Sequence, residues 1–458
     1  MNKTFDAIII GAGQAGPSLA ARFNDAQKTV ALIERDLLGG TCVNTGCTPT
    51  KALVASAKAA QMIRRAEDMG LPPQRLSGID LAAIQKRKDA IVAKSRGGLE
   101  KWLGGMKHCS VIHGATRFVG PDSVTVNGDV LQATQIFLNV GTRAAIPKLN
   151  GIDEVPYLTN STILKLDVLP SHLVVVGGSY VGLEFAQMFR RFGSDVTIVE
   201  RQSKLLSHED ADVSDAVRAI LEKEGIQVRT HAECIQLGMQ NSQPVVHVDC
   251  KEDVPEIVAS HVLLATGRIP NTDDLGLEAA GIKRDEKGYI PVNSRLETAI
   301  PGVWAMGDCN GRGAFTHTSY NDYEIVADNL LDGDSRKVSD RITAYALFID
   351  PPLARVGMTE AEIRKSGRRA LTGRRPMTRV GRAIEKGETE GFMKISVDAD
   401  SGQILGAAIL GVGGDEAIHC ILDAMYAKAP YTVIQRAMHI HPTVSELIPT
   451  MLGELKPL

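Results

Sequence analysis

The sequence lacks any apolar run near the ~18 residues that a membrane-spanning helix needs. It also lacks a charge excess of either sign, because 51 Lys and Arg residues against 54 acidic ones leave a net charge of -3. Such a balance gives no electrostatic reason to expect nucleic acid or an anionic membrane as a partner. The N-terminus shows no basic region followed by a long apolar stretch and a cleavage site, so no signal peptide is apparent. We expect a cytoplasmic protein that binds neither nucleic acid nor membrane.

Cysteine is scarce, with 7 residues in a chain of 458, which is too few for a secreted disulfide scaffold. Low-complexity tracts and short-period repeats are absent as well. Glycine, in contrast, is abundant at 44 residues, which implies many tight turns or close approaches of the backbone to a ligand. At about 150 residues per domain, the length predicts roughly three domains.

Two segments share one pattern of strand, glycine-rich turn, helix and second strand. The first has strands at 5–10 and 29–34 around the turn 11–16, and the second has strands at 172–176 and 195–200 around the turn 177–182. This pattern is typical of dinucleotide-binding folds. From residue 341 onward, strands at 343–348 and 392–397 alternate with helical stretches, which indicates a separate third domain. The sequence therefore predicts an α/β protein with two Rossmann-like domains and a C-terminal α+β domain.

The first glycine turn follows a strand and opens a helix, as a phosphate-binding turn requires. Gly11 permits the tight turn, Gly13 lets the backbone approach a pyrophosphate, and Gly16 allows close packing of the helix. Glu34 ends the next strand, where a carboxylate can accept the hydroxyls of an adenosine ribose. A glycine-rich turn without a ligand is the alternative, and the combined context favours a nucleotide site.

The second turn departs from the pattern because Ser179 stands where the central glycine belongs. Glu200 occupies the position equivalent to Glu34, where a carboxylate accepts the 2'-hydroxyl of NADH and repels the 2'-phosphate of NADPH. Arg201 and Lys204 can weaken that bias, or they simply face solvent. We expect NADH, with NADPH possible.

Cys42 and Cys47 are the two cysteines that lie close together in sequence. In a regular helix their Cα atoms would be about 8 Å apart, beyond the reach of a disulfide, so a bridge requires a bent turn. Thr48 followed by Pro49 predicts a helix start that places Cys47 near the positive end of the helix and favours its thiolate. Two buried thiols or a metal pair are the alternatives, although the spacing is unusual for zinc. We favour a redox function.

At this point the sequence resembles the class I pyridine nucleotide-disulfide oxidoreductases, which include dihydrolipoamide dehydrogenase, glutathione reductase and mercuric reductase. The resemblance begins at Gly40-Thr41-Cys42 and Cys47-Thr48-Pro49-Thr50-Lys51 and spans nearly the whole chain. It continues in order through segments 177–184, 265–271, 305–308, 350–357 and 441–446.

The resemblance implies that the first fold binds FAD and the second a nicotinamide nucleotide. It divides the chain into a first FAD-binding part (1–148), an NAD(P)-binding domain (149–270), a second FAD-binding part (271–338) and a dimerisation domain (339–458). It also implies an obligate homodimer, since the family completes each active site with residues from the other subunit.

The resemblance further assigns residues to the cofactors. Asp308 would hold the ribityl chain of the flavin, while Lys51 and Glu184 would form an ion pair beside the flavin and nicotinamide. Tyr180 would cover the flavin until the nicotinamide displaces it. The other motif positions are assigned to FAD (Gly11, Gly13, Gly16, Glu34, Thr41, Thr142, Gly307) and to the nicotinamide nucleotide (Gly177, Gly182, Glu200, Gly267).

By the same resemblance, electrons pass from NADH through FAD to a redox disulfide formed by Cys42 and Cys47. Cys47 would face the flavin as a thiolate, and Cys42 would attack the substrate. His441, oriented by Glu446, would be the acid-base group supplied by the other subunit. His439 lies close to it, but the context His-Pro-Thr-x-Ser-Glu selects His441.

The acceptor is less well defined than the donor. Ser179 and the Cys-Thr-Pro-Thr-Lys run resemble the mercuric reductase branch, yet the chain ends without the vicinal cysteine pair of that branch and has no N-terminal metal-binding extension. His441 and Glu446 favour a disulfide, either small or on a carrier protein. A metal ion or a quinone as acceptor, dihydrolipoamide dehydrogenase activity, and a flavin-bound redox sensor without turnover are the alternatives. No resident metal is predicted.

One basic run is not explained by this resemblance. Its eight cations are Arg364, Lys365, Arg368, Arg369, Arg374, Arg375, Arg379 and Arg382. They either form a solvated edge of the third domain, which we favour, or dock an acidic carrier or an anionic substrate.

Overall fold

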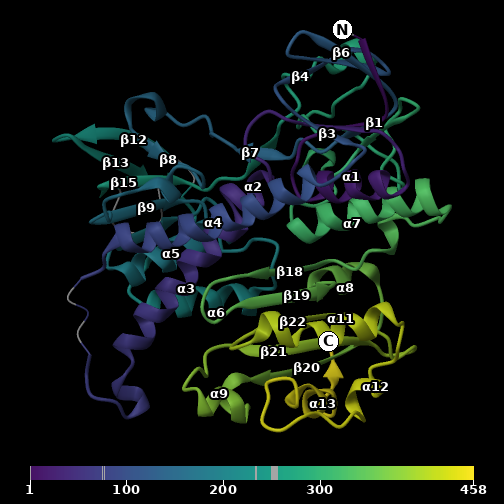
Figure 1. Ribbon diagram of the computed structural model, residues 1–458. Coiled ribbons are helices and arrows are strands. Elements are labelled where there is room, and N and C mark those ends of the chain that lie inside the picture. The colour runs from purple at the N-terminus through teal and green to yellow at the C-terminus, as the bar shows by residue number, and fades with distance from the viewer. Residues whose placement is uncertain (1, 75, 77, 233–234, 249–255) are drawn as a thin grey trace. The chain divides into compact units, whose positions relative to one another are not determined.

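The computed structural model (Figure 1) describes residues 2–74, 76, 78–232, 235–248 and 256–458. The chain divides into two compact units. Unit 1 comprises residues 1–52, 85–145 and 267–341, and unit 2 comprises residues 53–84, 146–266 and 342–458. The four-segment domain division expected from the sequence is finer than this one and stays a prediction.

Unit 1 is built on a seven-stranded sheet in which six strands have the order β3-β2-β1-β6-β5-β4. The seventh strand, β17, pairs with the C-terminal part of β6, residues 136–138. Strands β1, β2, β3, β6 and β17 run parallel, whereas β4, β5 and β6 form an antiparallel meander. A separate antiparallel pair joins β7 to β16. The strands are β1 (Asn2–Ile10), β2 (Val30–Glu34), β3 (Cys109–His113), β4 (Thr116–Gly120), β5 (Ser123–Val126), β6 (Asp129–Leu138), β7 (Thr142–Ala144), β16 (Arg268–Pro270) and β17 (Val303–Ala305).

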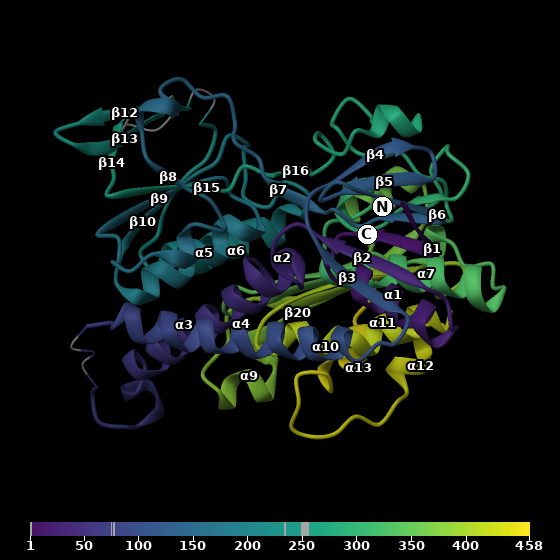
Figure 2. The same cartoon turned by 45° about the horizontal axis from the view of Figure 1, so that its top comes forward.

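The helices of unit 1 cover this sheet and carry the cysteine motif. Helices α1 and α7 lie side by side beneath the parallel strands (Figures 1 and 2). Helices α3 and α4 each begin in one unit and end in the other. The helices are α1 (Ala15–Asp25), α2 (Gly40–Asn44), α3 (Cys47–Arg64), α4 (Leu81–Gly104) and α7 (Thr316–Ala327), which continues as a π-helical turn over Asp328–Asp332.

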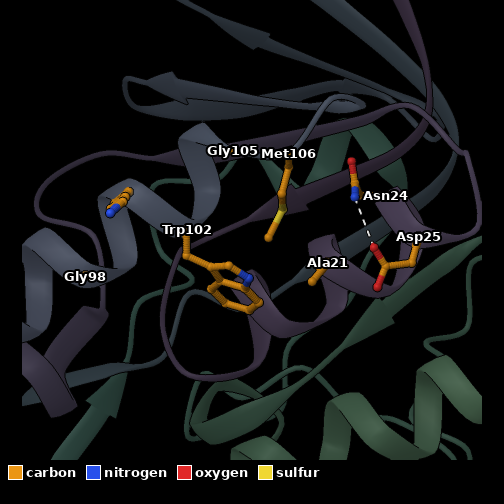
Figure 3. Close-up of a pocket in the computed structure, with 8 residues that line it drawn as sticks. Ala21, Asn24, Asp25, Gly98, Trp102, Gly105 and Met106 are labelled. Atoms are coloured by element: carbon orange, nitrogen blue, oxygen red, sulfur yellow. Dashed lines mark hydrogen bonds between the residues drawn. The ribbon is translucent and has the colours of Figure 1, made fainter.

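A cavity of about 560 Å³ opens between the C-terminal ends of α1 and α4. Trp102 of α4 faces Ala21 of α1 across it, and Asn24 donates a hydrogen bond of 3.1 Å to Asp25 at its edge (Figure 3). None of the residues predicted to bind cofactors or to act in catalysis lines this cavity.

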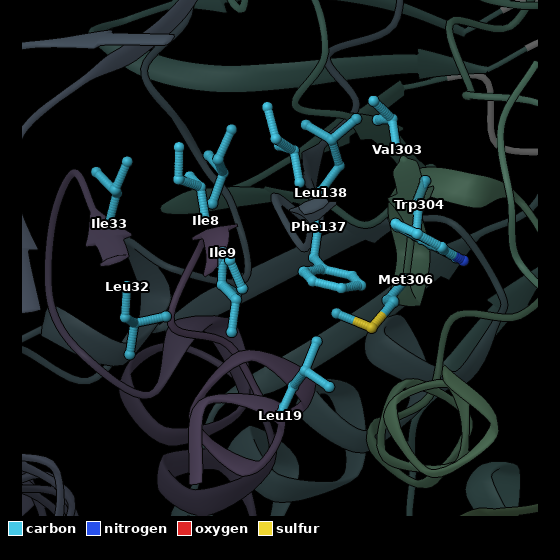
Figure 4. Close-up of a cluster of buried hydrophobic side chains, with 14 of the residues drawn as sticks. Ile8, Ile9, Leu19, Leu32, Ile33, Phe137, Leu138, Val303, Trp304 and Met306 are labelled. Carbon is cyan, nitrogen blue, oxygen red and sulfur yellow. The ribbon is translucent and has the colours of Figure 1, made fainter. Parts of the chain in front are cut away.

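The core of unit 1 lies between the parallel strands and their helices (Figure 4). Ile8 and Ile9 of β1 and Leu32 of β2 are fully buried, as expected for the central strands of a parallel sheet covered on both faces. Phe137 of β6 stacks on Trp304 of β17 with ring centroids 5.0 Å apart. This packing fixes the strand ends from which the glycine turn and residue 308 project.

Unit 2 contains a parallel sheet, a small antiparallel sheet and a C-terminal antiparallel sheet. The parallel sheet has the order β11-β10-β9-β15-β8, and the C-terminal sheet has the order β18-β19-β22-β21-β20-β23. The parallel strands are β8 (Tyr157–Leu158), β9 (His172–Val176), β10 (Asp195–Val199), β11 (Gln227–Arg229) and β15 (His261–Leu264). The small sheet comprises β12 (Ile235–Gln240), β13 (Gln243–Val248) and β14 (Glu256–Val258). The C-terminal strands are β18 (Ala344–Leu347), β19 (Leu353–Gly357), β20 (Ala370–Pro376), β21 (Phe392–Asp398), β22 (Ile404–Leu410) and β23 (Lys456–Pro457).

The helices of unit 2 follow the pattern predicted from the sequence. Gly193, with φ of +119°, ends the helix that follows the second glycine turn. The predicted strands at 5–10, 172–176 and 392–397 are confirmed to within a few residues. The helices are α5 (Tyr180–Phe192), α6 (Ala211–Lys223), α8 (Glu360–Ser366), α9 (Gly381–Glu385), α10 (Gly414–Ala417), α11 (His419–Tyr426), α12 (Thr432–Gln435) and α13 (Leu447–Leu452).

Candidate functional site

The first glycine turn has the close backbone contacts that the sequence predicts. Gly11 has φ of +104°, and a Cβ atom on it would lie 2.3 Å from the carbonyl oxygen of Asn139. A Cβ on Gly16 would lie 2.2 Å from the carbonyl oxygen of Gly11. At Gly13 the nearest protein atom would be 3.5 Å away, so the protein itself does not require glycine there. An open backbone at the start of α1 fits a pyrophosphate group.

The carboxylates that follow the two glycine turns make equivalent contacts. Glu34 accepts hydrogen bonds from the backbone N–H groups of Ala12 (2.8 Å) and Asp36 (2.9 Å). Glu200 accepts them from the N–H groups of Gly178 (2.6 Å) and Gln202 (2.7 Å). Each carboxylate is therefore held beside its turn at the end of the second strand, where a ribose would lie.

The second turn accommodates serine without strain. Gly177 has φ of +118°, and a Cβ on it would lie 2.4 Å from the carbonyl oxygen of Ala265. Ser179 has φ of -113°, which any residue adopts, and its side chain is exposed. Lys204 donates a hydrogen bond to the carbonyl oxygen of Glu209, so it is engaged within the protein, whereas Arg201 is exposed.

The bent turn required between the two cysteines is present. Cys42 lies in α2, which ends at Asn44, and Cys47 is the first residue of α3. The side-chain amide of Asn44 donates hydrogen bonds to the carbonyl oxygens of Leu38 (2.9 Å) and Gly40 (3.0 Å), which fixes the break between the helices. The predicted start of α3 at Thr48 and Pro49 was slightly late, because the carbonyl oxygen of Gly46 already accepts the N–H of Thr50.

The two cysteines are thiols in this structure, and their environments differ. Hydrogen bonding to Cys47, together with burial, raises the pKa of the Cys42 thiol. Cys47 is an exposed residue, and its Sγ atom lies 3.3 Å from the Oγ1 atom of Thr316, the first residue of α7. Sequence reasoning missed Thr316, because a single threonine so far along the chain carries no motif.

Thr142 and Asp308 come together at the ends of β7 and β17. The hydroxyl of Thr142 donates to the carboxylate of Asp308 at 2.7 Å, and Arg268 donates to both the hydroxyl (2.7 Å) and the carbonyl oxygen (2.6 Å) of Thr142. Burial raises the pKa of Asp308, while the hydrogen bond from Thr142 acts in the opposite direction. A partly buried carboxylate at this position fits a polyhydroxyl chain such as the ribityl group.

Asp322 of α7 fixes the turn that carries Asp308. Its carboxylate, 1% exposed, accepts hydrogen bonds from the N–H of Gly307 (2.7 Å) and the side chain of Asn310 (2.9 Å), and pairs with Arg341. Asp322 carries no sequence signal beyond an acidic residue in a helix, and nothing in the sequence indicates Arg268 as a partner of Thr142.

Tyr180 and Glu184 lie on α5 in unit 2. The ring of Tyr180 packs edge-on against Tyr345, with centroids 5.6 Å apart, and burial raises the pKa of Tyr180 to about 12. Glu184 is 6% exposed and accepts the backbone N–H of Phe348 at 2.9 Å. Lys51 belongs to unit 1, and its ion pair with Glu184 stays a prediction.

His441 and Glu446 form a pair close to the C-terminus. The Nδ1 atom of His441 lies 2.9 Å from a carboxylate oxygen of Glu446, and the His441 side chain is 80% exposed. His439 instead contacts the carbonyl oxygen of Ser445 through Nδ1 at 3.0 Å. Of these two histidines, His441 thus has the carboxylate partner that orients an imidazole for proton transfer.

The positions of the remaining assigned residues are compatible with their predicted roles. Thr41 is an exposed residue of α2, and Gly182 lets α5 approach the carbonyl oxygen of Gly177. Gly267 has φ of +124° directly before β16, and Gly307 begins the short helical turn that carries Asp308. Their functional assignments stay predictions.

The basic run between residues 364 and 382 is largely paired with carboxylates. Acidic partners lie within 4 Å of six of its cations. This supports the interpretation of the run as a solvated edge rather than as a docking surface. The pairs are Arg364–Glu360, Arg368–Asp398, Arg369–Asp400, Arg374–Asp212, Arg375–Glu454 and Arg382–Glu385.

Two features are absent from the part of the chain that the structure describes. No group of three or more His, Cys, Asp or Glu side chains is arranged to hold a metal ion among these residues. No helix within them is both long and apolar enough to cross a membrane.

Comparisons with known proteins identify the family. Residues 5–322 match the family described as pyridine nucleotide-disulphide oxidoreductase, and residues 343–452 match its dimerisation domain. The chain is 36% identical to the probable pyridine nucleotide-disulfide oxidoreductase RclA of Escherichia coli (strain K12), with 100% of both chains covered. It is 34% identical to dihydrolipoyl dehydrogenase of Thermus scotoductus (97% of this chain and 96% of that protein) and 32% identical to mercuric reductase of Streptomyces lividans (97% and 94%).

The fold agrees with these sequence matches. The structure of a Cu(II) complex of the HOCl-induced flavoprotein disulfide reductase RclA from Escherichia coli superposes with a TM-score of 0.90 at 35% identity, covering 99% of each chain. The chain therefore belongs to the pyridine nucleotide-disulfide oxidoreductase family and is a flavoprotein enzyme that uses FAD and NAD(P)H, as its motifs predict.

Proposed function

We propose that the enzyme uses NADH to reduce a disulfide substrate through Cys42 and Cys47. The observation that carries this proposal is the arrangement of the two sulfurs. They are close enough to share a hydrogen bond, across the break between α2 and α3, and Cys47 begins the second helix. Two such thiols can close into a disulfide and reopen without a large movement of the backbone.

The residues of unit 1 fit FAD. The open backbone at Gly13 would receive the pyrophosphate, Glu34 the adenosine ribose, and Asp308 with Thr142 the ribityl chain. Thr41, Lys51 and Gly307 are proposed to complete this site. When bound, FAD accepts a hydride from the nicotinamide and makes the electron pair available for reducing the cysteine disulfide.

The two thiols then act in turn. The Cys42 thiolate attacks the substrate disulfide, forms a mixed disulfide and releases one substrate thiolate, which takes up a proton. The Cys47 thiolate next attacks the Cys42 sulfur, which releases the second thiolate and closes the Cys42–Cys47 disulfide. The substrate gains the two electrons that the cysteine pair loses.

Cys42 needs a base for its part in this sequence, because its pKa is raised by hydrogen bonding to Cys47 and by burial. We propose that His441 of the partner subunit takes the proton and returns it to the leaving thiolate. The pairing of His441 with Glu446 and the exposure of its ring support this role. The match of residues 343–452 to a dimerisation domain supports a homodimer.

Glu200 supports NADH as the donor, since its carboxylate would accept the ribose 2'-hydroxyl and repel a 2'-phosphate. In unit 2, Gly177, Gly182, Tyr180 and Glu184 are proposed to contact the nucleotide. Gly267 is assigned to the nucleotide by its motif alone. Because NADH and reduced thiols are available in the cytoplasm, we propose that the enzyme acts there.

Anaerobic titration of the purified enzyme with NADH tests the proposal. Uptake of electrons with a long-wavelength thiolate-to-flavin absorbance band is the expected result, and the Cys47→Ser variant should lack the band. NADPH, titrated in parallel, should reduce the enzyme more slowly. Bleaching of the flavin without that band in the wild-type enzyme would remove the cysteines from the electron path and contradict the proposal.

Reduction of a metal ion is the second candidate. Its support comes from the mercuric reductase among the relatives and from the Cu(II) complex of RclA among the similar structures. The pairing of His441 with Glu446 instead favours a disulfide as the acceptor. Anaerobic NADH oxidation with Hg²⁺ or Cu²⁺ as the acceptor, compared with a low-molecular-weight disulfide at equal concentration, separates the two functions.

A further inference from the structure

The hydroxyl group of Thr316 reaches the Cys47 sulfur from a distant part of the chain. Thr316 begins α7, and its Oγ1 atom lies 3.3 Å from Sγ of Cys47, which begins α3. The two helix starts therefore meet within unit 1. A contact of 3.3 Å is within hydrogen-bonding distance for a sulfur atom, which is larger and more diffuse than oxygen.

Only one direction is open for this hydrogen bond once Cys47 is ionised. A thiolate has no proton to donate, so the hydroxyl must be the donor and the sulfur the acceptor. Hydrogen bonds to charged groups are the stronger class, and they favour the charged form of the acceptor. The neutral hydroxyl thereby stabilises the ionised sulfur without adding a charge.

The charged and titratable groups of unit 1 around this sulfur do not replace the hydroxyl. Arg268 interacts electrostatically with Cys47, but its charge is shared with Asp308 at 4.0 Å, and its Nε atom is directed at Thr142. Lys51 acts on the neighbouring Cys42 and favours its ionisation. Cys42 itself shares a hydrogen bond with Cys47 as long as it carries its proton.

We propose that Thr316 donates a hydrogen bond to the Cys47 thiolate and holds this sulfur in its ionised form in the reduced enzyme. This role rests on the proposed function, in which Cys47 is the thiolate facing the flavin. It adds to the groups that stabilise the thiolate a hydroxyl from α7, which lies outside the cysteine motif. The Thr316 hydroxyl also interacts with Cys42. Hydrogen bonding to Cys47 and burial raise the pKa of Cys42, whereas a hydrogen bond from Thr316 lowers it, so the hydroxyl lies within reach of both sulfurs.

The pH dependence of the thiolate absorbance band tests this inference. The holoenzyme is reduced anaerobically, and the band is titrated in the wild type and in Thr316→Val, which keeps the shape of the side chain but removes the hydroxyl. We expect the midpoint of Thr316→Val to rise by about one pH unit, which corresponds to about tenfold less thiolate at a pH well below the midpoint. Thr316→Ser, which restores a hydroxyl, should return the midpoint toward the wild-type value.

A matched control is available on the same helix. Thr318 is buried (8% exposed), and Thr318→Val should leave the midpoint unchanged. If Thr316→Val does not fold, Thr316→Ala takes its place in the titration. An unchanged midpoint in the valine or alanine variant, with the band present in the wild type, would overturn the inference.

A second measurement separates this inference from the proposed function. In the Cys42→Ser background, the pH profile of Cys47 alkylation by iodoacetamide reports its thiolate without using the absorbance band. The Thr316→Val substitution should shift this profile upward by the same amount. Absence of the band in the wild type would contradict the proposed function, while the alkylation profile would still decide whether Thr316 stabilises the thiolate.

Discussion

Glu200→Gln is the substitution that most directly tests how this enzyme selects its nucleotide. The two carboxylate oxygens of Glu200 accept one backbone N–H each, at 2.6 Å from Gly178 and 2.7 Å from Gln202. Glutamine keeps the length of the side chain but has one acceptor oxygen and no charge. The variant therefore removes the repulsion of a 2'-phosphate and weakens the acceptor for a ribose 2'-hydroxyl.

The expected size of the effect follows from the bonds that change. A hydrogen bond to a charged group contributes about 1.5–3 kcal/mol, and about 1.4 kcal/mol corresponds to a factor of ten. We expect kcat/KM for NADH to fall by about tenfold to a hundredfold. The kcat/KM for NADPH should fall less or rise, because the lost attraction concerns a hydroxyl that NADPH does not have.

Steady-state kinetics with each nucleotide, at saturating FAD, measure the ratio of kcat/KM for NADH to kcat/KM for NADPH. Glu34→Gln is the matched control, because Glu34 makes the same two backbone contacts at the first turn, at 2.8 and 2.9 Å. It should weaken retention of FAD and leave the ratio of NADH to NADPH efficiencies unchanged. A Glu200→Gln enzyme with the wild-type ratio would refute the assignment of Glu200 to nucleotide selection.

Three further predictions concern the thiols, the histidine pair and the buried charges. Cys47→Ser should lower the pKa of Cys42, because the hydrogen bond to Cys47 is the largest cause of the raised pKa. Alkylation of Cys42 by iodoacetamide near neutral pH, followed by mass spectrometry, should therefore become faster. An unchanged rate would contradict this cause. Glu446→Gln should slow disulfide reduction by about tenfold or more while sparing flavin reduction by NADH, measured by stopped flow; equal losses in both steps would argue against a proton-transfer role. Arg355→Met leaves the buried carboxylate of Glu209 (0% exposed) without its cation and should cost about 3–5 kcal/mol of unfolding free energy. Arg369→Met removes an exposed pair with Asp400 and should cost about 0–1 kcal/mol, so similar denaturant midpoints for the two variants would contradict this reasoning.

The features that sequence predicted well are those encoded within a short stretch of chain. The glycine turns and their flanking strands depend on backbone conformation and on apolar runs, both of which are visible locally. The break between Cys42 and Cys47 was predicted for the same reason, since a regular helix would separate the two residues too far. The start of α3 was predicted only approximately, because the Gly46 carbonyl that begins the hydrogen-bonding pattern has no side-chain signal.

The features that sequence missed arise where distant segments meet. Thr316 and Asp322 lie on one helix, yet one contacts the Cys47 sulfur and the other fixes the turn that carries Asp308. Arg268 reaches Thr142 because β7 and β16 pair antiparallel, and this pairing is not visible in either strand alone. Single polar residues of this kind show no periodicity, so only the tertiary structure indicates their partners.

The repeated use of a glutamate at both nucleotide turns has a consequence for how nucleotide preference can change. Glu200 already accepts the N–H of Gly178, so it shapes the turn in addition to its proposed contact with the ribose. A substitution that simply deletes the carboxylate leaves this N–H without its acceptor at the point where the phosphates would approach. A change toward NADPH therefore requires a side chain that still accepts this hydrogen bond while adding a cation for the 2'-phosphate. Arg201, which is exposed and directly follows Glu200, is placed to supply the cation but not the acceptor.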